Sequence, residues 1–371
     1  MAKTVLCVVG ARPNFMKIAP IMRAFKQAGK ANALLVHTGQ HYDATMKHQF
    51  FDQLGIPEPD IDLEVGSGSH AVQTAEVMKR FEPVLDKHQP DAILVVGDVN
   101  STIACALVAA KKNISVIHVE AGLRSYDRDM PEEVNRVLTD QISDWLYTTE
   151  KSAEDNLAKE GIERSRVVFT GNVMIDTLLH NLEKAVSAET TLERYEIGKN
   201  ILKNETGFAV VTMHRPSNVD DQDVLTRLLG SLTEISQDIP IVFPVHPRTE
   251  KQMTMFGLDG FFNNSNILKM TPLGYLELLG LVSKARVVLT DSGGIQEETT
   301  ALGVPCITLR ENTERPITVE DGTNTVVGTD AVKIMAAFRD VIETGGKAGR
   351  KPELWDGHAA ERIVEHINTW I

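Results

Sequence analysis

Acidic side chains occur in this sequence where buried strands are expected to end. Asp98 follows an apolar run at residues 91–96, and Glu120 follows another at residues 114–119. A third acid, Glu132, stands in the sequence MPEE, where a proline and the acids after it are typical of a helix start. Neighbouring carboxylates raise each other's proton affinity and can serve as acid–base pairs. The three acids therefore predict proton-transfer chemistry, although solvated strand and helix caps are the simpler alternative.

A second group of residues could bind an anion. The sequence TDSGGIQEE at residues 290–298 ends a predicted strand and begins a helix, and its candidate phosphate contacts are Ser292, Gly293 and Gly294. Backbone N–H groups at a helix start favour a phosphate, and glycines let the backbone approach it closely. Glu298, one turn later, could accept hydrogen bonds from ribose hydroxyls, and Arg315 could pair with phosphate charge. A serine N-cap followed by a glycine turn is the simpler alternative.

Other cations and histidines also follow apolar runs. Arg12 and Lys17 lie after the first run, in GARPNFMK, where a phosphate could bind at a helix start. This turn has one glycine where a dinucleotide fingerprint needs three, which argues against tightly bound NAD there. Among the histidines, His214 is the best candidate because it ends the first strand of the second half. No C-x-x-C spacing suggests zinc, and the histidines that follow apolar runs are divided between the two halves of the chain.

The elements that must position these residues alternate along the chain. Short apolar runs alternate with amphipathic helices, which predicts right-handed βαβ units and parallel sheets in an α/β fold. The pattern occurs twice, so we expect two doubly wound, Rossmann-like domains at residues 1–172 and 173–358. A long helix is predicted from residue 173 to about residue 195. The carboxyl ends of parallel strands share one edge of a sheet, where ligands bind. Asp98 and Glu120 should therefore end neighbouring strands.

Composition limits the classes of function. The chain has 371 residues, 42% of them hydrophobic, and a net charge of −13. This balance argues against a generally basic nucleic-acid surface, and no apolar stretch approaches the roughly 20 residues of a membrane span. The three cysteines, Cys7, Cys105 and Cys306, lie in apolar segments without metal-ligand spacing and are typical of buried thiols in a reducing compartment. We expect a cytosolic protein.

Taken together, the motifs resemble the non-hydrolysing UDP-N-acetylglucosamine 2-epimerase family over nearly the whole chain. They are, in order, GARPNFMK (10–17), HTGQHYDATM (37–46), VVGDVNST (95–102), HVEAGLRS (118–125), MPEEVNR (130–136), TMHR (212–215), VHPRT (245–249), LTDSGGIQEE (289–298) and ENTERP (311–316). The resemblance implies a glycosyltransferase-B fold of two Rossmann-like domains with the active site in the interdomain cleft. It also implies that the last helix, residues 359–371, returns to the first domain.

The resemblance implies inversion of C2 of UDP-N-acetylglucosamine (UDP-GlcNAc) to give UDP-N-acetylmannosamine (UDP-ManNAc), with no cofactor and no metal. UDP would leave by anti-elimination to give a 2-acetamidoglucal, and it would re-add after a proton returns to the other face of C2. By match to the family's motifs, the catalytic residues are Asp98, Glu120, Glu132 and His214. The UDP contacts are Arg12, Lys17, Ser292, Gly293, Gly294, Glu298 and Arg315. The family also suggests a homodimer.

Two positions depart from the family's pattern. Leu278 stands where many members have an aromatic residue near the uracil. Gln40 and His41 match the Gln-His motif of a second, activating UDP-GlcNAc site, but Val72 stands where that site has an arginine. The segment QHYDATM also resembles a branch that epimerises UDP-2,3-diacetamido-2,3-dideoxyglucuronate. The sequence therefore leaves two candidate sugars for the substrate.

Three other functions remain as alternatives. A hydrolysing epimerase would release free ManNAc, and a UDP-sugar glycosyltransferase on the same fold would need a wide acceptor surface or a basic membrane face. A nucleotide-sugar-binding regulator would keep the DSGG motif and Arg315 but would not need three carboxylates.

Overall fold

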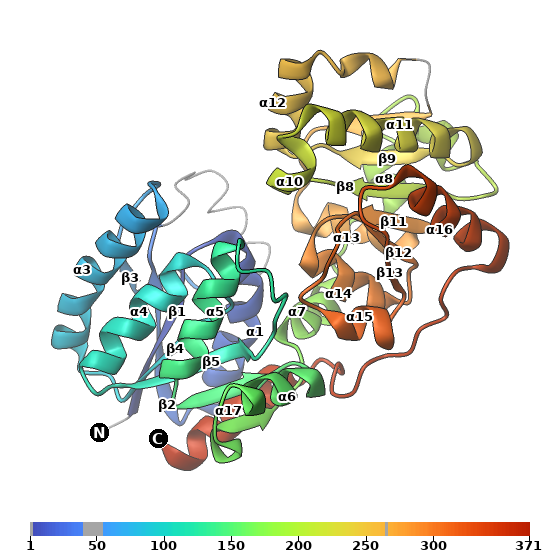
Figure 1. Cartoon of the computed structure of the whole chain (residues 1–371). Helices are drawn as coiled ribbons and strands as arrows, with labels where there is room; N and C mark the ends of the chain where they lie inside the picture. Colours follow the sequence, from blue (N-terminus) through green and yellow to red (C-terminus); the bar gives the residue numbers. More distant parts are fainter. Residues whose placement is uncertain (1–2, 40–54, 264–265) are drawn as a thin grey trace. The chain divides into compact units, whose positions relative to one another are not determined.

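The computed structural model describes residues 3–39, 55–263 and 266–371, and its contacts divide the chain into two compact units. Unit 1 comprises Met1–His180 and Glu353–Ile371, and unit 2 comprises Asn181–Pro352. Each unit is an α/β domain with its own sheet (Figure 1), as the alternating pattern predicted. The predicted boundary at residue 173 falls at the start of the helix that contains this division.

Unit 1 is built on a seven-stranded sheet in the order β3-β2-β1-β4-β5-β6-β7, and every pairing is parallel. Its strands are β1 (Lys3–Val9), β2 (Ala31–His37), β3 (Ile61–Asp62), β4 (Ala92–Val96), β5 (Ser115–Ala121), β6 (Trp145–Thr148) and β7 (Val167–Phe169). Its helices are α1 (Arg12–Ala28), α3 (His70–His88), α4 (Asn100–Lys111), α5 (Pro131–Ile142), α6 (Lys151–Lys159), α7 (Val173–Leu182, which ends in unit 2) and α17 (Ala359–Trp370). The order reverses between β1 and β4, so this is a doubly wound sheet.

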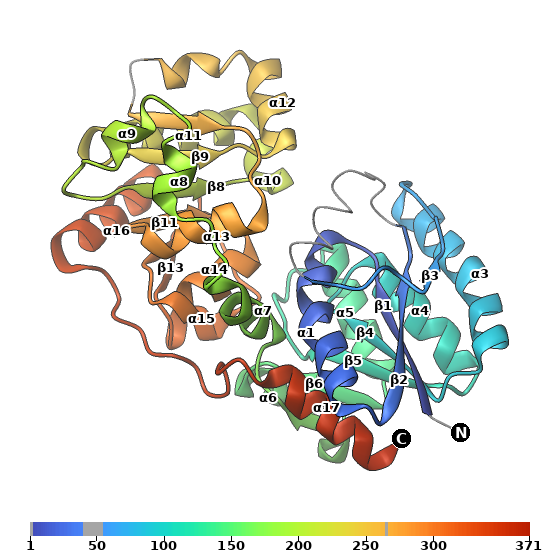
Figure 2. The same ribbon diagram turned by 180° about the vertical axis from the view of Figure 1, so that it is seen from behind.

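Both faces of this sheet are covered. Helices α3, α4 and α5 lie on one face, and α1 and α17 lie on the other (Figures 1 and 2). On the first face, Leu6 and Val8 of β1 pack in one buried cluster with Phe81 of α3. The alternate residues Val5 and Cys7 are also fully buried. A strand buried on both faces must be apolar throughout, which explains the continuous apolar runs in the sequence.

Unit 2 repeats the plan with a six-stranded sheet in the order β10-β9-β8-β11-β12-β13, again with parallel pairings. Its strands are β8 (Ala209–Thr212), β9 (Ile241–Pro244), β10 (Ile267–Met270), β11 (Val287–Thr290), β12 (Cys306–Thr308) and β13 (Asn324–Val326). Its helices are α8 (Ala188–Leu192), α9 (Gly198–Ile201), α10 (Pro216–Val219), α11 (Gln222–Asp238), α12 (Pro247–Phe256), α13 (Tyr275–Lys284), α14 (Gly293–Leu302), α15 (Pro316–Glu320) and α16 (Ala331–Thr344). Alternate strand residues enter two separate cores, because Val211 packs with α11 and α16 whereas Val210 packs with α13.

The last helix, α17, belongs to unit 1, where it packs against α1. The chain before it is anchored by Trp355, which is 1% exposed and donates its indole N–H to the carbonyl of Thr149 at 3.1 Å. The carboxylate of Asp176 in α7 accepts the N–H groups of Ala359 and Ala360 at 3.1 and 2.7 Å, and so caps the start of α17. These contacts hold α17 in unit 1.

The long helix predicted from residue 173 to about residue 195 is wrong. Helix α7 ends at Leu182, and a short α8 starts again after Ser187, whose hydroxyl accepts the N–H of Thr190. The reason is tertiary, because the Val186 N–H donates to the carbonyl of Leu276 at 3.0 Å. That approach is open only because residue 280 is glycine, since a Cβ there would lie 1.7 Å from the Val186 carbonyl oxygen. In the described part of the chain, no helix combines the length and apolarity needed to cross a membrane.

Candidate active site

Several predicted site residues of each unit follow strands at, or next to, the point where the sheet order reverses. In unit 1, Lys17 lies in the helix after β1, while Asp98 and Glu120 lie at the ends of β4 and β5. Strands β4 and β5 are paired in register, which confirms that the two acids end neighbouring strands. In unit 2, His214 follows β8 and Ser292 follows β11, and these two strands are also paired. Ligands of doubly wound sheets bind at such reversals.

Glu120 adopts an unusual backbone conformation. Its φ of +72° lies in the left-handed region, and the pairing of β5 with β6 shifts register at this residue. A non-glycine residue in this region costs about 1–3 kcal/mol, and such outliers cluster at functional sites. Here the bulge takes the Glu120 carboxylate out of the ladder and into a buried ion pair with Lys17. A Cβ at Gly97 would lie 2.8 Å from Lys17 Nζ and 3.4 Å from Glu120 Oε2, and the φ of Gly97, +66°, also favours glycine beside the pair.

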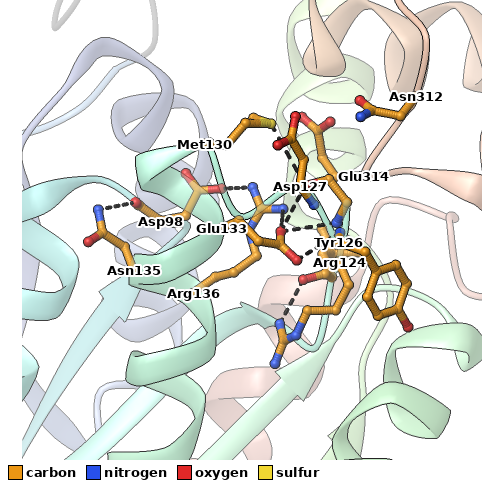
Figure 3. Close-up of polar contacts among 12 residues, drawn as sticks. Asp98, Arg124, Tyr126, Asp127, Met130, Glu133, Asn135, Arg136, Asn312 and Glu314 are labelled. Atoms are coloured by element: carbon orange, nitrogen blue, oxygen red, sulfur yellow. Dashed lines mark hydrogen bonds and ion pairs between the residues drawn. The ribbon is translucent and has the colours of Figure 1, made fainter.

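Asp98 is held by two residues of α5. Its carboxylate Oδ2 accepts a hydrogen bond from Arg136 Nη2 at 2.5 Å, and its carbonyl accepts one from Asn135 Nδ2 at 2.9 Å (Figure 3). The Asp98 side chain is 23% exposed, whereas that of Arg136 is 4% exposed. A buried guanidinium therefore orients a carboxylate that solvent or substrate can still reach. This is a suitable arrangement for a group that exchanges protons with a ligand.

Glu132 and Glu133 stand side by side at the start of α5 but have different environments. Glu132 is half-buried. Glu133 is buried and accepts hydrogen bonds from the N–H groups of Ser125 and Tyr126 at 3.0 and 2.9 Å and from Arg136 Nη1 at 2.8 Å (Figure 3). Glu133 thus ties the loop after β5 to α5. The catalytic role of Glu132 stays a prediction. Glu133 has a structural role, because its hydrogen bonds hold the loop after β5 against α5.

In unit 2, Asp291 orients His214. The carboxylate oxygens of Asp291 lie 3.1 and 2.9 Å from the backbone nitrogen of His214, and its Oδ1 lies 3.1 Å from the ring Nδ1. Burial alone would raise the pKa of Asp291, but hydrogen bonding and charge from His214 hold that pKa below its ordinary value. The carboxylate accepts from Nδ1–H, so Nε2 is the ring nitrogen left to meet a ligand. The His214 side chain is 39% exposed and can reach a ligand.

The start of α14 lies beside a cluster of arginines in unit 2. Glu314 accepts from Arg310 Nη1 at 2.8 Å, and its other oxygen lies 3.3 Å from Arg315 Nη1 and 3.5 Å from Arg215 Nη2. Arg315 Nε also lies 3.1 Å from a carboxylate oxygen of Glu297. A Cβ on Gly293 would come within 3.0 Å of Glu314 Oε1, so this cluster meets the first turn of the helix. Three guanidinium groups beside helix N–H groups are suited to bind a phosphate.

Some predicted residues are placed less completely. Arg12 is the first residue of α1. Gln40 and His41 lie outside the described residues, so the activating site stays a prediction. Leu278 is half-buried in α13, where it packs against the unit 2 core. Among the residues that the structure describes, no group of three or more His, Cys, Asp or Glu side chains is arranged to hold a metal ion.

Comparison with known proteins decides the family. The family model for UDP-N-acetylglucosamine 2-epimerase matches residues 23–368. The chain is 42% identical to the UDP-N-acetylglucosamine 2-epimerase of Methanocaldococcus jannaschii over 360 residues, which cover 96% of both proteins. The chain belongs to the UDP-N-acetylglucosamine 2-epimerase family. It is therefore an epimerase, as its motifs predicted.

Solved structures of this epimerase family have the same fold. The M. jannaschii UDP-GlcNAc 2-epimerase in complex with UDP-GlcNAc and UDP matches with a TM-score of 0.87 and 40% identity, covering 99% of each chain. The Neisseria meningitidis enzyme bound to UDP-GlcNAc matches with a TM-score of 0.86 and 30% identity, covering 99% of this chain and 100% of that one. A relative with a different named substrate is the UDP-2,3-diacetamido-2,3-dideoxy-D-glucuronate 2-epimerase of Pseudomonas aeruginosa, which is 39% identical over 98% of this chain and 99% of its own length.

Glu298 gives this epimerase-family chain a pH-dependent stability. Burial, followed by the carboxylate of Glu297, raises the pKa of Glu298 to about 7, while the nearby Tyr275 hydroxyl opposes the shift. The folded protein thus holds a proton that the unfolded chain releases near pH 4.3. This contribution to stability is fully present below about pH 4.5 and is lost as the pH rises through about 7.

We expect Glu298→Gln to gain stability relative to the wild type as the pH rises from about 5 to about 8, by on the order of 3 kcal/mol. Urea unfolding of both proteins across this range measures the difference. Glu343→Gln, a change of an exposed glutamate on α16, is the matched control. A constant difference between Glu298→Gln and the wild type would contradict the buried, protonated state.

Sequence reasoning missed several residues that frame the site. Arg136, Glu133 and Asp291 position predicted residues, yet none was singled out. Arg136 and Glu133 lie three residues apart in a helix start, which is a recognisable ion-pair spacing. Asp291 lies next to the predicted Ser292, but its role depends on pairing of β8 with β11, which brings His214 beside it. Such long-range pairs have no local signal.

Proposed function

We propose that this chain interconverts UDP-GlcNAc and UDP-ManNAc by inverting C2. A base removes the C2 proton while the C1–O bond to UDP breaks, which leaves a 2-acetamidoglucal and UDP. A proton then returns to the opposite face of C2, and UDP re-adds at C1. The observation that carries the proposal is the pair of acids at the ends of β4 and β5, in a chain of the 2-epimerase family.

Unit 1 supplies the proton-transfer groups in this proposal. Asp98, Glu120 and Glu132 exchange protons at the two faces of C2. The Lys17–Glu120 pair and the Asp98–Arg136 pair support the assignment, because each carboxylate is held in place by a cation.

Unit 2 binds UDP and stabilises it as a leaving group. The developing charge on the diphosphate is met by the first N–H groups of α14, by Ser292, Gly293 and Gly294, and by Arg315. His214 acts beside the leaving diphosphate through Nε2, while Glu298 accepts from the ribose and Leu278 contacts the uracil. Arg12 and Lys17 are the other proposed phosphate contacts. The complexes of relatives with UDP-GlcNAc or UDP support a UDP-sugar as the ligand.

A second substrate has a specific observation in its favour. The P. aeruginosa relative at 39% identity is named for the diacetamido glucuronate sugar, which undergoes the same inversion at C2. Incubation of the purified protein with each nucleotide sugar, followed by anion-exchange chromatography, separates the possibilities. Conversion of UDP-GlcNAc to UDP-ManNAc is the expected result. Conversion of the uronate alone would favour the second substrate, and free ManNAc with UDP would indicate hydrolysis. UDP binding without any conversion would overturn the proposed enzyme activity.

Two further features complete the proposal. We expect a homodimer, which light scattering after size-exclusion chromatography would detect as twice the mass of one chain. The three cysteines are free and buried, which supports a reducing, cytosolic location.

The proposed phosphate contact of Arg315 can be tested by a conservative change. Lysine keeps the charge beside Glu297 and Glu314 but lacks the planar fork that binds two oxygens at once. We expect Arg315→Lys to weaken UDP binding about tenfold, equivalent to about 1.4 kcal/mol, as measured by calorimetry. Arg339→Lys, a change of an arginine that is 64% exposed on α16, is the control. Equal affinity in both variants would remove Arg315 from the UDP site.

A further inference from the structure

Asn218 is a buried amide of unit 2 that the proposed mechanism does not use. It lies in α10, shortly after His214 in the chain, and it is 2% exposed. Its Nδ2 lies 2.8 Å from the carbonyl oxygen of Leu309 and 3.2 Å from Oδ2 of Asp291. A carbonyl oxygen only accepts hydrogen bonds, so the atom that faces it must be the amide nitrogen, which has two hydrogens to donate. One amide therefore binds the residues that directly follow β12 and β11.

Asp291 holds the segment 214–218 at both of its ends. At the start, the N–H groups of His214 and Arg215 donate to its Oδ2 at 2.9 and 2.8 Å. At the end, Asn218 Nδ2 donates to the same oxygen. The other oxygen, Oδ1, lies 3.1 Å from the ring Nδ1 of His214. The carboxylate that orients the His214 ring is thus itself held by Asn218.

The Asp291 carboxylate depends on donors from the protein, because its side chain is 0% exposed. A buried acceptor that loses a hydrogen bond is costly unless the groups around it move. Without the Asn218 amide, the carboxylate could rotate toward its remaining donors, and the His214 ring bonded to Oδ1 would turn with it. Aspartate at residue 218 would have the shape of asparagine but would place an acceptor against two acceptors. The site therefore requires an amide.

The second contact of Asn218 connects His214 to the arginine cluster. Leu309 directly precedes Arg310, which donates to Glu314 within that cluster at 2.8 Å. Strands β8, β11 and β12 are neighbours in the sheet, and the Asn218 amide joins the segments that follow all three. In the proposed reaction the histidine and the arginines act on the same diphosphate, so the rate depends on their relative placement.

We propose that Asn218 is a positioning residue that holds Asp291, and through it the His214 ring, in a fixed place beside the arginine cluster while UDP leaves and returns. The inference rests on the proposed function, because it takes His214 to act beside the leaving diphosphate. Asn218 is buried and acts only through Asp291 and the Leu309 carbonyl.

The positioning role predicts a loss of rate without a loss of affinity. We expect Asn218→Ala to lower kcat about thirtyfold while KM and the UDP dissociation constant change less than about threefold, because small displacements of reacting groups act on the chemical step. Asn266→Ala is the matched control, since the Asn266 amide of unit 2 donates to a single carbonyl, that of Ser236, at 3.0 Å. It should keep the wild-type kcat. Unchanged kcat in Asn218→Ala, or an equal loss of kcat and UDP affinity, would overturn the role.

A double-mutant cycle tests whether Asn218 acts through Asp291. Asp291→Asn should itself lower kcat, because an amide has one accepting oxygen where a carboxylate has two. In the Asp291→Asn background, Asn218→Ala should lower kcat by less than about threefold further, since residues that act as a unit are not additive. The same loss of kcat from Asn218→Ala in both backgrounds would mean that the two residues act independently, and would overturn the inference.

Hydrogen exchange detected by mass spectrometry tests the positioning role without substrate. Peptides that contain residues 214–218 should exchange about tenfold faster in Asn218→Ala than in the wild type, because the segment is then held to Asp291 at one end only. Peptides from α11 serve as the reference and should exchange equally in both proteins. Equal exchange of the segment 214–218 in both proteins would overturn the inference.

Failure of this inference is distinguishable from failure of the proposed function. If the wild type epimerises a UDP-sugar and Asn218→Ala keeps its kcat, the inference alone is wrong. If the wild type converts neither nucleotide sugar, the proposed function is wrong and the role of Asn218 in the reaction falls with it. Should Asn218→Ala fail to fold, Asn218→Ser is measured in its place, because a hydroxyl keeps one donor. If neither variant folds, Asn218 is needed for folding and the specific role is overturned.

Discussion

Glu120→Gln is expected to lower kcat for epimerisation by a factor on the order of 10³ while UDP still binds, because a positioned acid–base group contributes about 10²–10⁴-fold. Glutamine keeps the shape of the side chain, and its oxygen can still face Lys17, but it cannot take a proton from C2. Steady-state rates with UDP-GlcNAc, together with UDP binding by calorimetry, separate loss of chemistry from loss of the site. The melting temperature, measured by circular dichroism, reports how much stability is lost when residue 120 no longer neutralises the Lys17 charge.

Glu64→Gln is a matched control for this change. Glu64 is also a glutamate of unit 1 with a left-handed backbone, at φ +49°, but it is exposed and lies after the edge strand β3. The control therefore makes the same chemical change in a similar conformation away from the proposed site. We expect it to keep wild-type kcat and melting temperature. A kcat for Glu120→Gln within about threefold of this control would contradict a proton-transfer role for Glu120.

The neighbours Glu132 and Glu133 are expected to respond oppositely to the same change. Glu133→Gln should lower the free energy of unfolding by about 3 kcal/mol, because it removes one charge of a buried pair with Arg136. The loss stays near the low end of the range for such pairs because Asp98 still offsets the Arg136 charge. Glu132→Gln should change stability by less than about 0.5 kcal/mol, as is usual for a position without a buried network.

The two variants should rank in the opposite order for kcat, with the larger loss in Glu132→Gln. Glu132→Gln is expected to lower kcat by about 10² or more with normal UDP binding, because it removes a proposed proton-transfer group. Urea unfolding and steady-state kinetics on both variants give the four values needed. If Glu132→Gln kept full kcat while Glu133→Gln lost turnover without losing stability, the catalytic acid of this motif would be Glu133.

Much of the fold could be predicted because its cause is local. Strands buried on both faces must be apolar throughout, so β1, β4 and β5 are visible as short runs ending at polar residues. Alternation with helices then gives parallel sheets and places the strand ends at one edge. That reasoning was sufficient to predict that Asp98 and Glu120 end neighbouring strands.

The remaining features depend on contacts between distant residues. Helix α7 stops at Leu182 because of a hydrogen bond between Val186 and Leu276, which no pattern near residue 182 reports. The Asp98–Arg136 pair joins residues 38 positions apart. The left-handed backbone of Glu120 arises from a register shift between β5 and β6, which glutamate's own preferences would oppose. Sequence patterns therefore predicted where Asp98 and Glu120 lie but not the contacts that orient them.

The central claim is proton exchange at C2 during epimerisation, and proton NMR of the purified protein with UDP-GlcNAc in D₂O tests it most directly. The account predicts that UDP-ManNAc appears with deuterium at C2 and that the remaining UDP-GlcNAc also gains deuterium there as the reaction reverses. Epimerisation with full retention of the original C2 proton would contradict exchange through the carboxylates of unit 1. Complete absence of UDP-ManNAc, with the diacetamido glucuronate sugar also unchanged, would contradict the proposed function itself.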